Sequence, residues 1–302
     1  MTDNPTPDHS SSTAAITTAI AALPPLRDII AAHDLAARKG LGQHFLLDLN
    51  LTMRIARAAD EIEGATVIEV GPGPGGLTRA LLGAGAGRVI AIEKDPRCTL
   101  ALQPLLAAAA GRLELHAEDA LQSDEAKLAP GRGIYIISNL PYNVGTVLIV
   151  KWLKQIAADP GRYAALVVLL QKEVAARLAA SPRTKAYGRL SVMAQWLTEA
   201  TACFDIGARA FTPPPKVDST VIRLTPLAQR RAEAEWDDME AVTRTAFGQR
   251  RKMLRASLKP IFGTDTQAVL TEAGIRAEAR AEELSVENFA TLARLHARRR
   301  GA

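Results

Sequence analysis

Short runs of β-branched and aliphatic residues alternate with helical segments through the middle of the chain. The runs that predict strands span residues 66–70, 88–92, 113–116, 133–138 and 165–170. Segments with helical spacing of apolar residues lie near 77–82, 99–110, 146–156 and 173–180. Apolar strands that alternate with helices are typical of parallel strands covered on both faces. The pattern therefore predicts an α/β fold with a doubly wound sheet.

The pattern changes after the fifth of these strands. Residues 200–206 and 220–224 predict two further strands, and a proline-rich loop beginning at Phe211 joins them. We expect this pair to close one edge of the sheet as an antiparallel hairpin. Past Pro226 only helical segments follow, near residues 237–247, 252–258, 266–273 and 286–298. We therefore expect a sheet domain over residues 23–228 and a small helical domain over residues 229–302.

The composition of the chain argues against secretion and membrane insertion. Residues 1–22 are rich in Ser, Thr and Ala and lack a basic start, so we expect a weakly ordered arm and not a signal peptide. No apolar run reaches the ~18 residues that a membrane span requires, so no membrane contact is expected. The two cysteines, Cys98 and Cys203, are too few for a disulfide framework, which favours the cytoplasm.

A glycine-rich segment, Glu69-Val-Gly71-Pro-Gly73-Pro-Gly75-Gly76, follows the first predicted strand. Glycine lets the backbone turn sharply and approach a ligand closely at the start of a helix. The spacing of Gly71, Gly73 and Gly76 matches G-x-G-x-x-G, which is compatible with NAD, FAD or S-adenosylmethionine. A tight turn without a ligand is the simpler alternative, but the density of glycine favours nucleotide binding.

Acidic residues follow the next two predicted strands. Glu93 ends the second strand beside the glycine-rich segment, and Asp119 follows the third. A carboxylate at the C-terminal end of a strand accepts hydrogen bonds from ribose hydroxyls, which is the role expected of Glu93. We expect Asp119 to accept a hydrogen bond from an adenine amino group, although a strand-end acid is more often simply solvated.

The fourth strand runs into Asn139-Leu140-Pro141-Tyr142, which discriminates among these nucleotide-binding functions. This segment resembles a pattern found in enzymes that methylate an amino group conjugated to a ring. Such an amine is a poor nucleophile because its lone pair is delocalised. If the Asn139 side-chain oxygen and the Leu140 carbonyl accept its N–H groups, a pyramidal nitrogen is favoured. Pro141 fixes the turn in this interpretation, and Tyr142 stacks on the base.

Several segments together resemble the ribosomal RNA adenine N6-dimethyltransferases, and within them the bacterial small-subunit enzyme that dimethylates two adjacent adenosines. The resemblance runs from about Leu26 to Leu292 and includes Lys39-Gly-Leu-Gly-Gln-His-Phe-Leu46, Glu69-Val-Gly-Pro-Gly73, Asn139-Leu-Pro-Tyr-Asn143, Gln171-Lys-Glu173, Phe211-Thr-Pro-Pro-Pro-Lys-Val-Asp-Ser219 and Phe247-Gly-Gln-Arg-Arg-Lys-Met-Leu254. It implies a class I, Rossmann-like methyltransferase fold with a C-terminal helical domain and S-adenosylmethionine as cofactor.

The resemblance also assigns site residues. The family's cofactor contacts fall on His44, Leu46, Gly71, Glu93, Asp119 and Asn139. The family often has Asn at the position of His44, and no second metal ligand lies at a useful spacing from this histidine, so no metal is expected. Phe211 falls on the family's second aromatic at the target base and, with Tyr142, is expected to form a two-sided stacking slot.

The charges of the chain are compatible with a nucleic-acid partner. The chain has 37 Lys and Arg against 32 Asp and Glu, a net charge of +5, which permits an anionic partner without identifying one. Arg250, Arg251, Lys252 and Arg255 cluster in the sequence with no acid between them. We expect these four residues to contact RNA phosphates, a solvated helix face being the simpler alternative. The glycine-broken basic stretch Arg38–Leu46 is expected to be a loop, ordinary or lying over a ligand.

The resulting hypothesis is a monomeric enzyme that dimethylates the N6 amino groups of two adjacent adenosines near the 3′ end of 16S rRNA, within the small ribosomal subunit or its precursor. Two alternatives remain. One is a dimethylase of large-subunit RNA, against which the Phe247–Lys252 block weighs. The other is a non-catalytic RNA-binding assembly or transcription factor on a methyltransferase scaffold. Intact Gly71, Glu93, Asp119 and Asn139–Tyr142 argue against lost catalysis.

Overall fold

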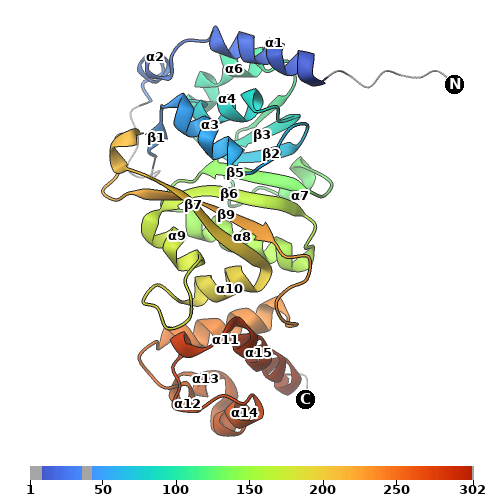
Figure 1. Cartoon of the computed structure of the whole chain (residues 1–302), viewed down its shortest axis with the longest axis vertical. Coiled ribbons are helices and arrows are strands. Elements are labelled where there is room, and N and C mark those ends of the chain that lie inside the picture. Colours follow the sequence, from blue (N-terminus) through green and yellow to red (C-terminus); the bar gives the residue numbers. More distant parts are fainter. Residues whose placement is uncertain (1–8, 36–42, 301–302) are drawn as a thin grey trace, which may run out of the picture. The chain divides into compact units, whose positions relative to one another are not determined.

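Seven strands of the described residues, 9–35 and 43–300 of a computed structural model, form the main sheet (Figure 1). In sheet order they are β4 (Leu113–His116), β3 (Arg88–Ile92), β2 (Thr66–Val70), β5 (Ile134–Asn139), β6 (Tyr163–Gln171), β9 (Ser219–Pro226) and β7 (Thr198–Ile206). The neighbours β4–β3, β3–β2, β2–β5 and β5–β6 pair in parallel. The predicted α/β fold is confirmed.

The order of the strands creates a reversal point beside β2. From β2 the chain proceeds outward to β3 and β4, and it then returns to place β5 on the other side of β2. In open α/β sheets, ligands bind outside the C-terminal ends of the strands at such a reversal. The two loops that leave β2 and β5 at this point carry the glycine-rich segment and Asn139–Tyr142.

Helices connect the strands, and a short second sheet lies apart from the main one. The helices of the first half are α1 (His9–Ala21), α2 (Leu26–Ala32), α3 (Leu49–Arg57), α4 (Gly76–Gly83), α5 (Pro96–Ala101), α6 (Gln103–Ala108), α7 (Glu125–Leu128) and α8 (Gly145–Ala158). Strand β1 (Phe45–Leu46) pairs antiparallel with β8 (Phe211–Thr212), which follows the 3-10 turn η2 (Ala208–Ala210). This small sheet joins segments that are far apart in the sequence.

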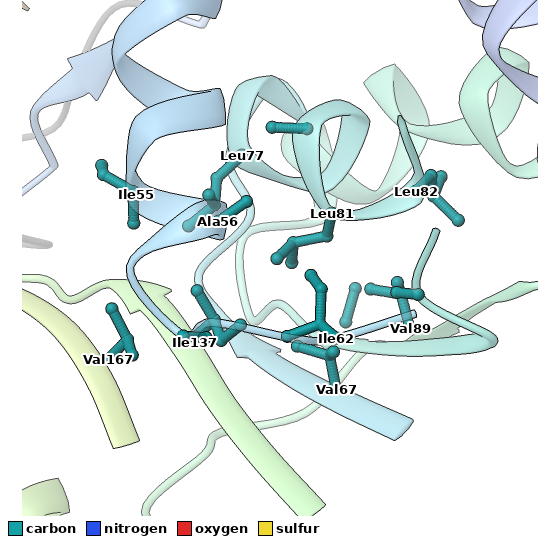
Figure 2. Close-up of a cluster of buried hydrophobic side chains, with 14 of the residues drawn as sticks. Ile55, Ala56, Ile62, Val67, Leu77, Leu81, Leu82, Val89, Ile137 and Val167 are labelled. Atoms are coloured by element: carbon teal, nitrogen blue, oxygen red, sulfur yellow. The ribbon is translucent and has the colours of Figure 1, made fainter. Parts of the chain in front are cut away.

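The core of the sheet is built from aliphatic side chains of the predicted strands and of helices that cover them. Figure 2 shows Ile55 of α3 and Leu81 of α4 in one cluster with the strand residues Val67, Val89 and Ile137. Ile55, Leu81 and the three strand residues are fully buried. Burying one such side chain contributes about 1.5–3 kcal/mol, so this cluster fixes α3 and α4 on the strands whose ends carry the site.

The N-terminal stretch differs from the expected arm. Over the described residues it forms α1, which packs on α4 and α6. Ile16 and Ile20 are one helical turn apart, so they share a face of α1, and both are buried in the core cluster. No single helix in the described ranges is long and apolar enough to cross a membrane, although Thr13–Ala21 and Leu26–Ala32, bent by 58°, meet the length and composition together.

The chain divides into two compact units. The first comprises the described residues up to Ile149 with Arg162–Lys172 and Cys203–Arg223, and the second comprises Val150–Gly161, Glu173–Ala202 and the described residues from Leu224 onward. The second unit therefore takes in more of the chain than the expected helical domain 229–302. The Trp196 and Trp236 rings, with centroids 6.4 Å apart, are one reason for the difference.

The helices of the second half are α9 (Lys172–Leu178), α10 (Arg189–Leu197), α11 (Trp236–Gly248), α12 (Leu254–Ser257), α13 (Lys259–Phe262), α14 (Thr266–Glu272) and α15 (Val286–Arg300), with 3-10 turns η3 (Gly263–Asp265) and η4 (Ala281–Glu283). The ring of Phe247 stacks on Phe289 and meets the edge of Tyr187. These contacts tie α11 to α15 and to the loop before α10, so the second unit has an aromatic core of its own.

Candidate active site

A cavity of about 960 Å³, counted out to the solvent at its mouth, opens at the C-terminal ends of β2, β3 and β5. It lies at the reversal point of the sheet. Its walls hold most of the side chains singled out in the sequence: His44, Leu46, Gly71, Glu93, Asp119, Asn139, Leu140, Pro141 and Tyr142. Phe211 is not among the residues that line it.

The glycine-rich loop forms one wall of the cavity. Its backbone conformation and its close neighbours leave no room for a side chain at several of its glycines. Gly71, Gly73 and Gly75 have φ values of 68°, 56° and 90°, in the left-handed region that disfavours other residues. A Cβ atom on Gly73 would lie 2.9 Å from the Phe45 ring. A Cβ atom on Gly76 would lie 2.8 Å from the backbone oxygen of Leu46. The loop backbone is therefore held close against β1 at the edge of the cavity.

Glu93 is the buried acceptor of the cavity. Its side chain follows β3 and is 5% exposed. The backbone N–H of Gly73 donates to its Oε2 at 3.1 Å, and the backbone N–H of Asp95 donates to its Oε1 at 2.9 Å. Burial raises the pKa of Glu93, while these two N–H groups act in the opposite direction. A carboxylate has about four acceptor positions, so both oxygens can accept further hydrogen bonds from a ligand.

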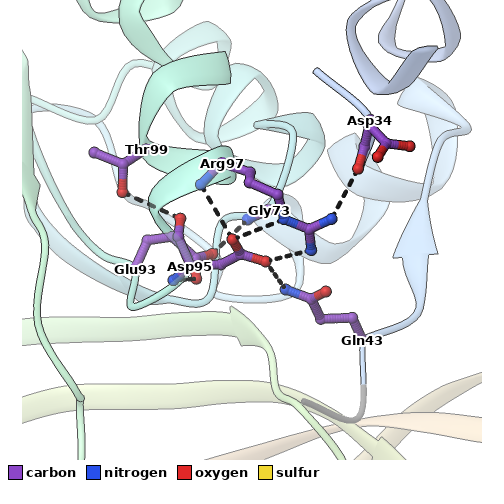
Figure 3. Close-up of polar contacts among 7 residues, drawn as sticks. All are labelled: Asp34, Gln43, Gly73, Glu93, Asp95, Arg97 and Thr99. Atoms are coloured by element: carbon purple, nitrogen blue, oxygen red, sulfur yellow. Dashed lines mark hydrogen bonds and ion pairs between the residues drawn. The ribbon is translucent and has the colours of Figure 1, made fainter. Parts of the chain in front are cut away.

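A polar cluster behind Glu93 escaped the sequence analysis (Figure 3). Asp95 is 2% exposed and accepts hydrogen bonds from the Arg97 guanidinium at 2.7 and 3.1 Å. The Gln43 side chain donates to the same carboxylate at 3.3 Å, and Arg97 donates to the backbone oxygen of Asp34 at 2.7 Å. The Arg97 guanidinium holds the pKa of Asp95 below its usual value. The cluster thus ties the start of α5 to Asp34 and Gln43. The expected loop residues 38–42 lie outside the described residues.

Glu69, the first residue of the glycine-rich segment, is a second buried carboxyl group in the cavity wall. It is 1% exposed, and the Thr78 hydroxyl donates to its Oε2 at 2.6 Å. Burial raises the pKa of Glu69 to about 8; the Thr78 hydrogen bond lowers it and the charge of Glu93 raises it further. Glu69 is therefore mostly neutral at pH 7 and adds little negative charge to the wall. An acidic residue inside an apolar strand was the available sequence signal.

Asp119 lies in the cavity wall as expected, but it has a neighbour of opposite charge. Its Oδ2 is 3.5 Å from Nζ of Lys94, and its Oδ1 accepts the backbone N–H of Leu121 at 3.0 Å. Both members of the ion pair are partly exposed and both line the cavity. Asp119 can therefore present an acceptor to a ligand while Lys94 offsets its charge.

Asn139 ends β5 with a defined amide orientation. Its Nδ2 donates to the backbone carbonyl of His44 at 3.0 Å. Because a carbonyl oxygen only accepts hydrogen bonds, the nitrogen must face His44, and Oδ1 is left as the free acceptor of the side chain. Asn139 lines the cavity with Leu140 and Pro141. The arrangement has the polarity expected for holding an amino group.

Tyr142 is held at both its ring and its hydroxyl group. The hydroxyl lies 2.5 Å from Oγ of Ser219, the first residue of β9. The ring centroid lies 5.1 Å from that of His44, with the planes tilted by 34°. Nδ1 of His44 is in turn 2.8 Å from the backbone oxygen of Pro213. Burial raises the pKa of Tyr142, so its hydroxyl stays protonated at neutral pH.

Phe211 occupies a different place from the expected one. Its ring is 2% exposed and belongs to the hydrophobic core cluster. Phe211 lies in β8 opposite Leu46 of β1, and both side chains are buried, whereas the next residue, Thr212, is exposed. Alternation along the strand therefore directs Phe211 into the core. In this structure the stacking slot that we expected between Tyr142 and Phe211 is not formed.

The basic cluster is also less uniform than its sequence suggests. The Arg250 side chain pairs with Glu282 at 2.7 Å and donates to the backbone oxygen of Thr184 at 3.2 Å. Arg255 pairs with Glu278 at 3.7 Å. These acids come from a segment that is distant in the sequence, so the absence of acids within the basic run did not reveal them. Arg251 and Lys252 are exposed and form no ion pair in the described part of the chain.

The described residues contain no group of three or more His, Cys, Asp or Glu side chains placed to hold a metal ion. The cavity wall contains carboxyl, amide, backbone and aromatic groups. The glycine loop, Glu93, Asn139 and Tyr142 all line this one cavity.

Comparison with known proteins places these features in one family. The family model for ribosomal RNA adenine dimethylase matches residues 35–298. The chain is 57% identical over 274 residues to the ribosomal RNA small subunit methyltransferase A of Rhodospirillum rubrum, covering 90% of this chain and 92% of the relative. It is 53% identical over 283 residues to the protein of the same name from Azorhizobium caulinodans, covering 94% and 96%.

Two solved structures support the fold. The crystal structure of the 23S rRNA methyltransferase ErmE has a TM-score of 0.61 at 28% identity, covering 83% of this chain and 98% of that one. A dimethyladenosine transferase from Plasmodium falciparum has a TM-score of 0.67 at 23% identity, covering 85% and 98%. The fold is that of the Rossmann-like methyltransferases, and the chain belongs to the ribosomal RNA adenine dimethylase family.

Proposed function

We propose that this protein transfers methyl groups from S-adenosylmethionine to the N6 amino groups of two adjacent adenosines near the 3′ end of 16S rRNA, giving N6,N6-dimethyladenosines during small-subunit biogenesis. The observation that carries the proposal is the orientation of Asn139 in the wall of the cavity. Its Oδ1 is presented as an acceptor in the same cavity as Glu93 and the glycine loop. The names of the relatives from R. rubrum and A. caulinodans support the choice of the small subunit.

The residues of the cavity fit S-adenosylmethionine. Gly73 and Gly76 lie where a Cβ atom would force the loop off β1, and the buried carboxylate of Glu93 is a suitable acceptor for ribose hydroxyls. Asp119 offers an acceptor for the adenine amino group, and His44 and Leu46 complete the wall. When bound, the cofactor supplies an electrophilic methyl group on a sulfonium.

The chain's own contribution to catalysis is to make the target amine nucleophilic and to hold it in place. Asn139 Oδ1 and the Leu140 carbonyl accept the two N–H bonds of the adenine amine, which favours a pyramidal nitrogen. Pro141 fixes the turn so that both acceptors face the same way. Tyr142 offers a ring face for stacking on the base. Asn139 does not ionise, so it positions the amine and does not act as a general base.

The proton released from the methylated nitrogen needs no dedicated base in this proposal. As the new N–C bond forms and the methyl–sulfur bond breaks, the nitrogen becomes cationic and acidic, and it loses its proton to solvent. Glu69 is mostly neutral at pH 7 because burial raises its pKa to about 8. In the proposal, the neutral form of Glu69 limits the negative charge of the cavity wall.

The second unit offers cations for the RNA. We assign phosphate contacts to Arg251 and Lys252 first, because both are exposed and neither has an ion-pair partner in the described residues. Arg250 and Arg255 remain candidates, but an RNA phosphate would have to compete with Glu282 and Glu278 for them. An excess of unpaired positive charge favours binding to nucleic acid.

One assay separates this function from its alternatives. Methyl-labelled S-adenosylmethionine is incubated with the protein and unmethylated small subunits, large subunits or free ribosomal RNA, and the labelled nucleotide is located. Dimethyladenosine in small-subunit RNA supports the proposal. Label in large-subunit RNA would support the alternative to which the likeness to ErmE points. Binding of RNA without transfer of label would support a non-catalytic factor.

A further inference from the structure

We propose that His44 is a positioning residue for the target base, acting through the ring of Tyr142 and the amide of Asn139. This inference rests on the proposed function and extends it. The family resemblance gave His44 only a cofactor contact, and the structure adds contacts to three other residues. Its imidazole meets Tyr142 and Pro213, and its backbone carbonyl meets Asn139.

The hydrogen bond to Pro213 fixes the imidazole. Nδ1 lies 2.8 Å from the Pro213 backbone oxygen. A carbonyl oxygen has no proton to donate, so Nδ1 must carry the hydrogen. The ring is thereby held to the loop after β8, while the adjacent residue Phe45 pairs with Thr212 of that strand. Backbone pairing and the side-chain bond together fix where the imidazole lies.

The distance between the rings of His44 and Tyr142 shows whether a base can stack between them. Their centroids are 5.1 Å apart. A base between two rings needs van der Waals contact of ~3.5–4.0 Å on each side, so there is no room for one here. His44 is therefore not the second wall of a stacking slot. It supports the Tyr142 ring, and in this proposal the target adenine stacks on the opposite face of that ring.

The two groups proposed to hold the target base, the Tyr142 ring and the Asn139 amide, therefore both contact His44. The Ser219 hydroxyl holds the far end of Tyr142, and the His44 ring supports its face. The His44 carbonyl holds the nitrogen of the Asn139 amide and turns Oδ1 toward the amine. Since the backbone carbonyl survives a side-chain substitution, changes at His44 are expected to act mainly through Tyr142.

The test is a double-mutant cycle with His44→Ala and Tyr142→Ala, read by single-turnover methylation of small subunits with mono- and dimethyladenosine quantified separately. An aromatic contact of this kind corresponds to a roughly 2- to 10-fold effect, so His44→Ala should slow the second methylation by that factor. In the Tyr142→Ala background the same change should have almost no further effect. Independent, multiplicative effects would overturn the proposal.

Two further variants separate the contacts of the imidazole. His44→Phe keeps a ring against Tyr142 and loses the donor to Pro213, whereas His44→Asn keeps a donor and loses the ring. Each should fall between wild type and His44→Ala. His33→Ala, a histidine outside the cavity, is the matched control and should match wild type. The methylation assays are run at saturating S-adenosylmethionine, and calorimetry measures the affinity of each variant for it, so that a change in cofactor binding is separated from the coupling to Tyr142. A lowered affinity without coupling to Tyr142 would assign His44 to the cofactor alone.

A spectroscopic measurement that requires no methylation tests the contact between His44 and Tyr142 independently of the proposed function. Fluorotyrosine labels the four tyrosines of the chain, and Tyr142→Phe identifies the ¹⁹F resonance of Tyr142. That resonance should shift in His44→Ala and stay in place in His33→Ala. If wild-type protein methylates no ribosomal subunit, the proposed function fails while this signal still reports on the contact. An unmoved resonance in His44→Ala would overturn the positioning role.

Discussion

The Asn139 side chain donates from Nδ2 to the backbone carbonyl of His44 at 3.0 Å, and this bond leaves Oδ1 as the acceptor that the proposed mechanism assigns to the target amine. Asn139→Ala removes an acceptor whose interaction strengthens as the nitrogen becomes pyramidal. We expect kcat to fall ~10²–10³-fold, typical of the loss of one preorganised polar group. Single-turnover kinetics on small subunits measures this. Full dimethylation at the wild-type rate would contradict the mechanism.

Glu93 should govern cofactor affinity. Glu93→Ala removes the proposed acceptor for ribose hydroxyls and also leaves the backbone N–H of Gly73 without its carboxylate acceptor. Hydrogen bonds to a charged group are worth ~1.5–3 kcal/mol, so affinity for S-adenosylmethionine should fall roughly ten- to a hundred-fold or more. Calorimetry gives the affinity, and thermal unfolding verifies that the variant is folded. Unchanged affinity in a folded variant would remove Glu93 from the cofactor site.

Glu69 should make stability depend on pH. Its pKa is raised from 4.5 to about 8 in the folded protein, so the carboxyl contributes most to stability at low pH. Between those two values the unfolded state has lost the proton that the folded state retains. The free energy of unfolding should therefore decrease as pH rises through this range, by up to about 1.4 kcal/mol per pH unit from this group.

The matched variant for this effect is Glu69→Gln, which keeps an acceptor for Thr78 and has no proton to lose. Urea unfolding at several pH values should give a flatter profile for the variant, with the difference in stability from wild type increasing toward pH 8. Parallel profiles for the two proteins would show that Glu69 is ionised in the folded state at neutral pH.

Local signals predicted much of the fold and the cavity. The strands β2 to β6 were visible because buried parallel strands are short apolar runs, and the wall residues Gly71, Glu93 and Asn139 directly follow or end such strands. Parallel strands bring their C-terminal ends to one edge, so residues at those ends converge without any knowledge of the loops. The position of these residues in one cavity follows from topology alone.

The features that sequence reasoning missed depend on pairs of distant residues. Asp95 binds Gln43, and Arg250 binds Glu282, across separations that no local pattern records. Phe211 has the composition of a stacking residue, but its exposure depends on which face of β8 meets the core. Pairing with Leu46 determines that face, and the pairing arises only in the folded chain.

The basic cluster of the second unit should divide into two classes. Neutralising Arg251 and Lys252 together should weaken binding to small subunits and reduce the slope of log affinity against log salt by about one for each RNA phosphate that the variant no longer binds. Lys127→Ala with Lys154→Ala removes the same charge at other exposed sites and is the control. Affinity for S-adenosylmethionine should remain unchanged in both pairs.

Arg250→Ala should behave differently from that pair. Its guanidinium joins Glu282 to the Thr184 carbonyl, so its loss should lower thermal stability, and any loss of RNA binding should follow from that. If Arg250→Ala reduced the salt slope at unchanged stability, Arg250 would be a direct phosphate ligand. If the double variant kept the affinity and slope of wild type, Arg251 and Lys252 would be solvated charges only.

Substitutions of Tyr142 and Phe211 should have distinguishable effects on methylation and stability, although the sequence predicted the same role for both residues. Tyr142→Ala removes a ring in the cavity wall, and base–aromatic stacking is worth about 1–3 kcal/mol. We expect weaker binding of the target and more singly methylated product, because the base must be held again for the second transfer. Thermal stability should change little by comparison.

Phe211→Ala instead removes a ring that is 2% exposed in the core, and cavity-forming substitutions of this kind cost about 3–5 kcal/mol of stability. Thermal unfolding should show this loss, and Phe211→Leu should restore most of it because it refills the apolar volume. The ratio of mono- to dimethyladenosine made by the Phe211→Leu enzyme should then match wild type. If Phe211→Leu were fully stable but accumulated monomethyladenosine as Tyr142→Ala does, Phe211 would have to leave the core and stack on the base during the reaction.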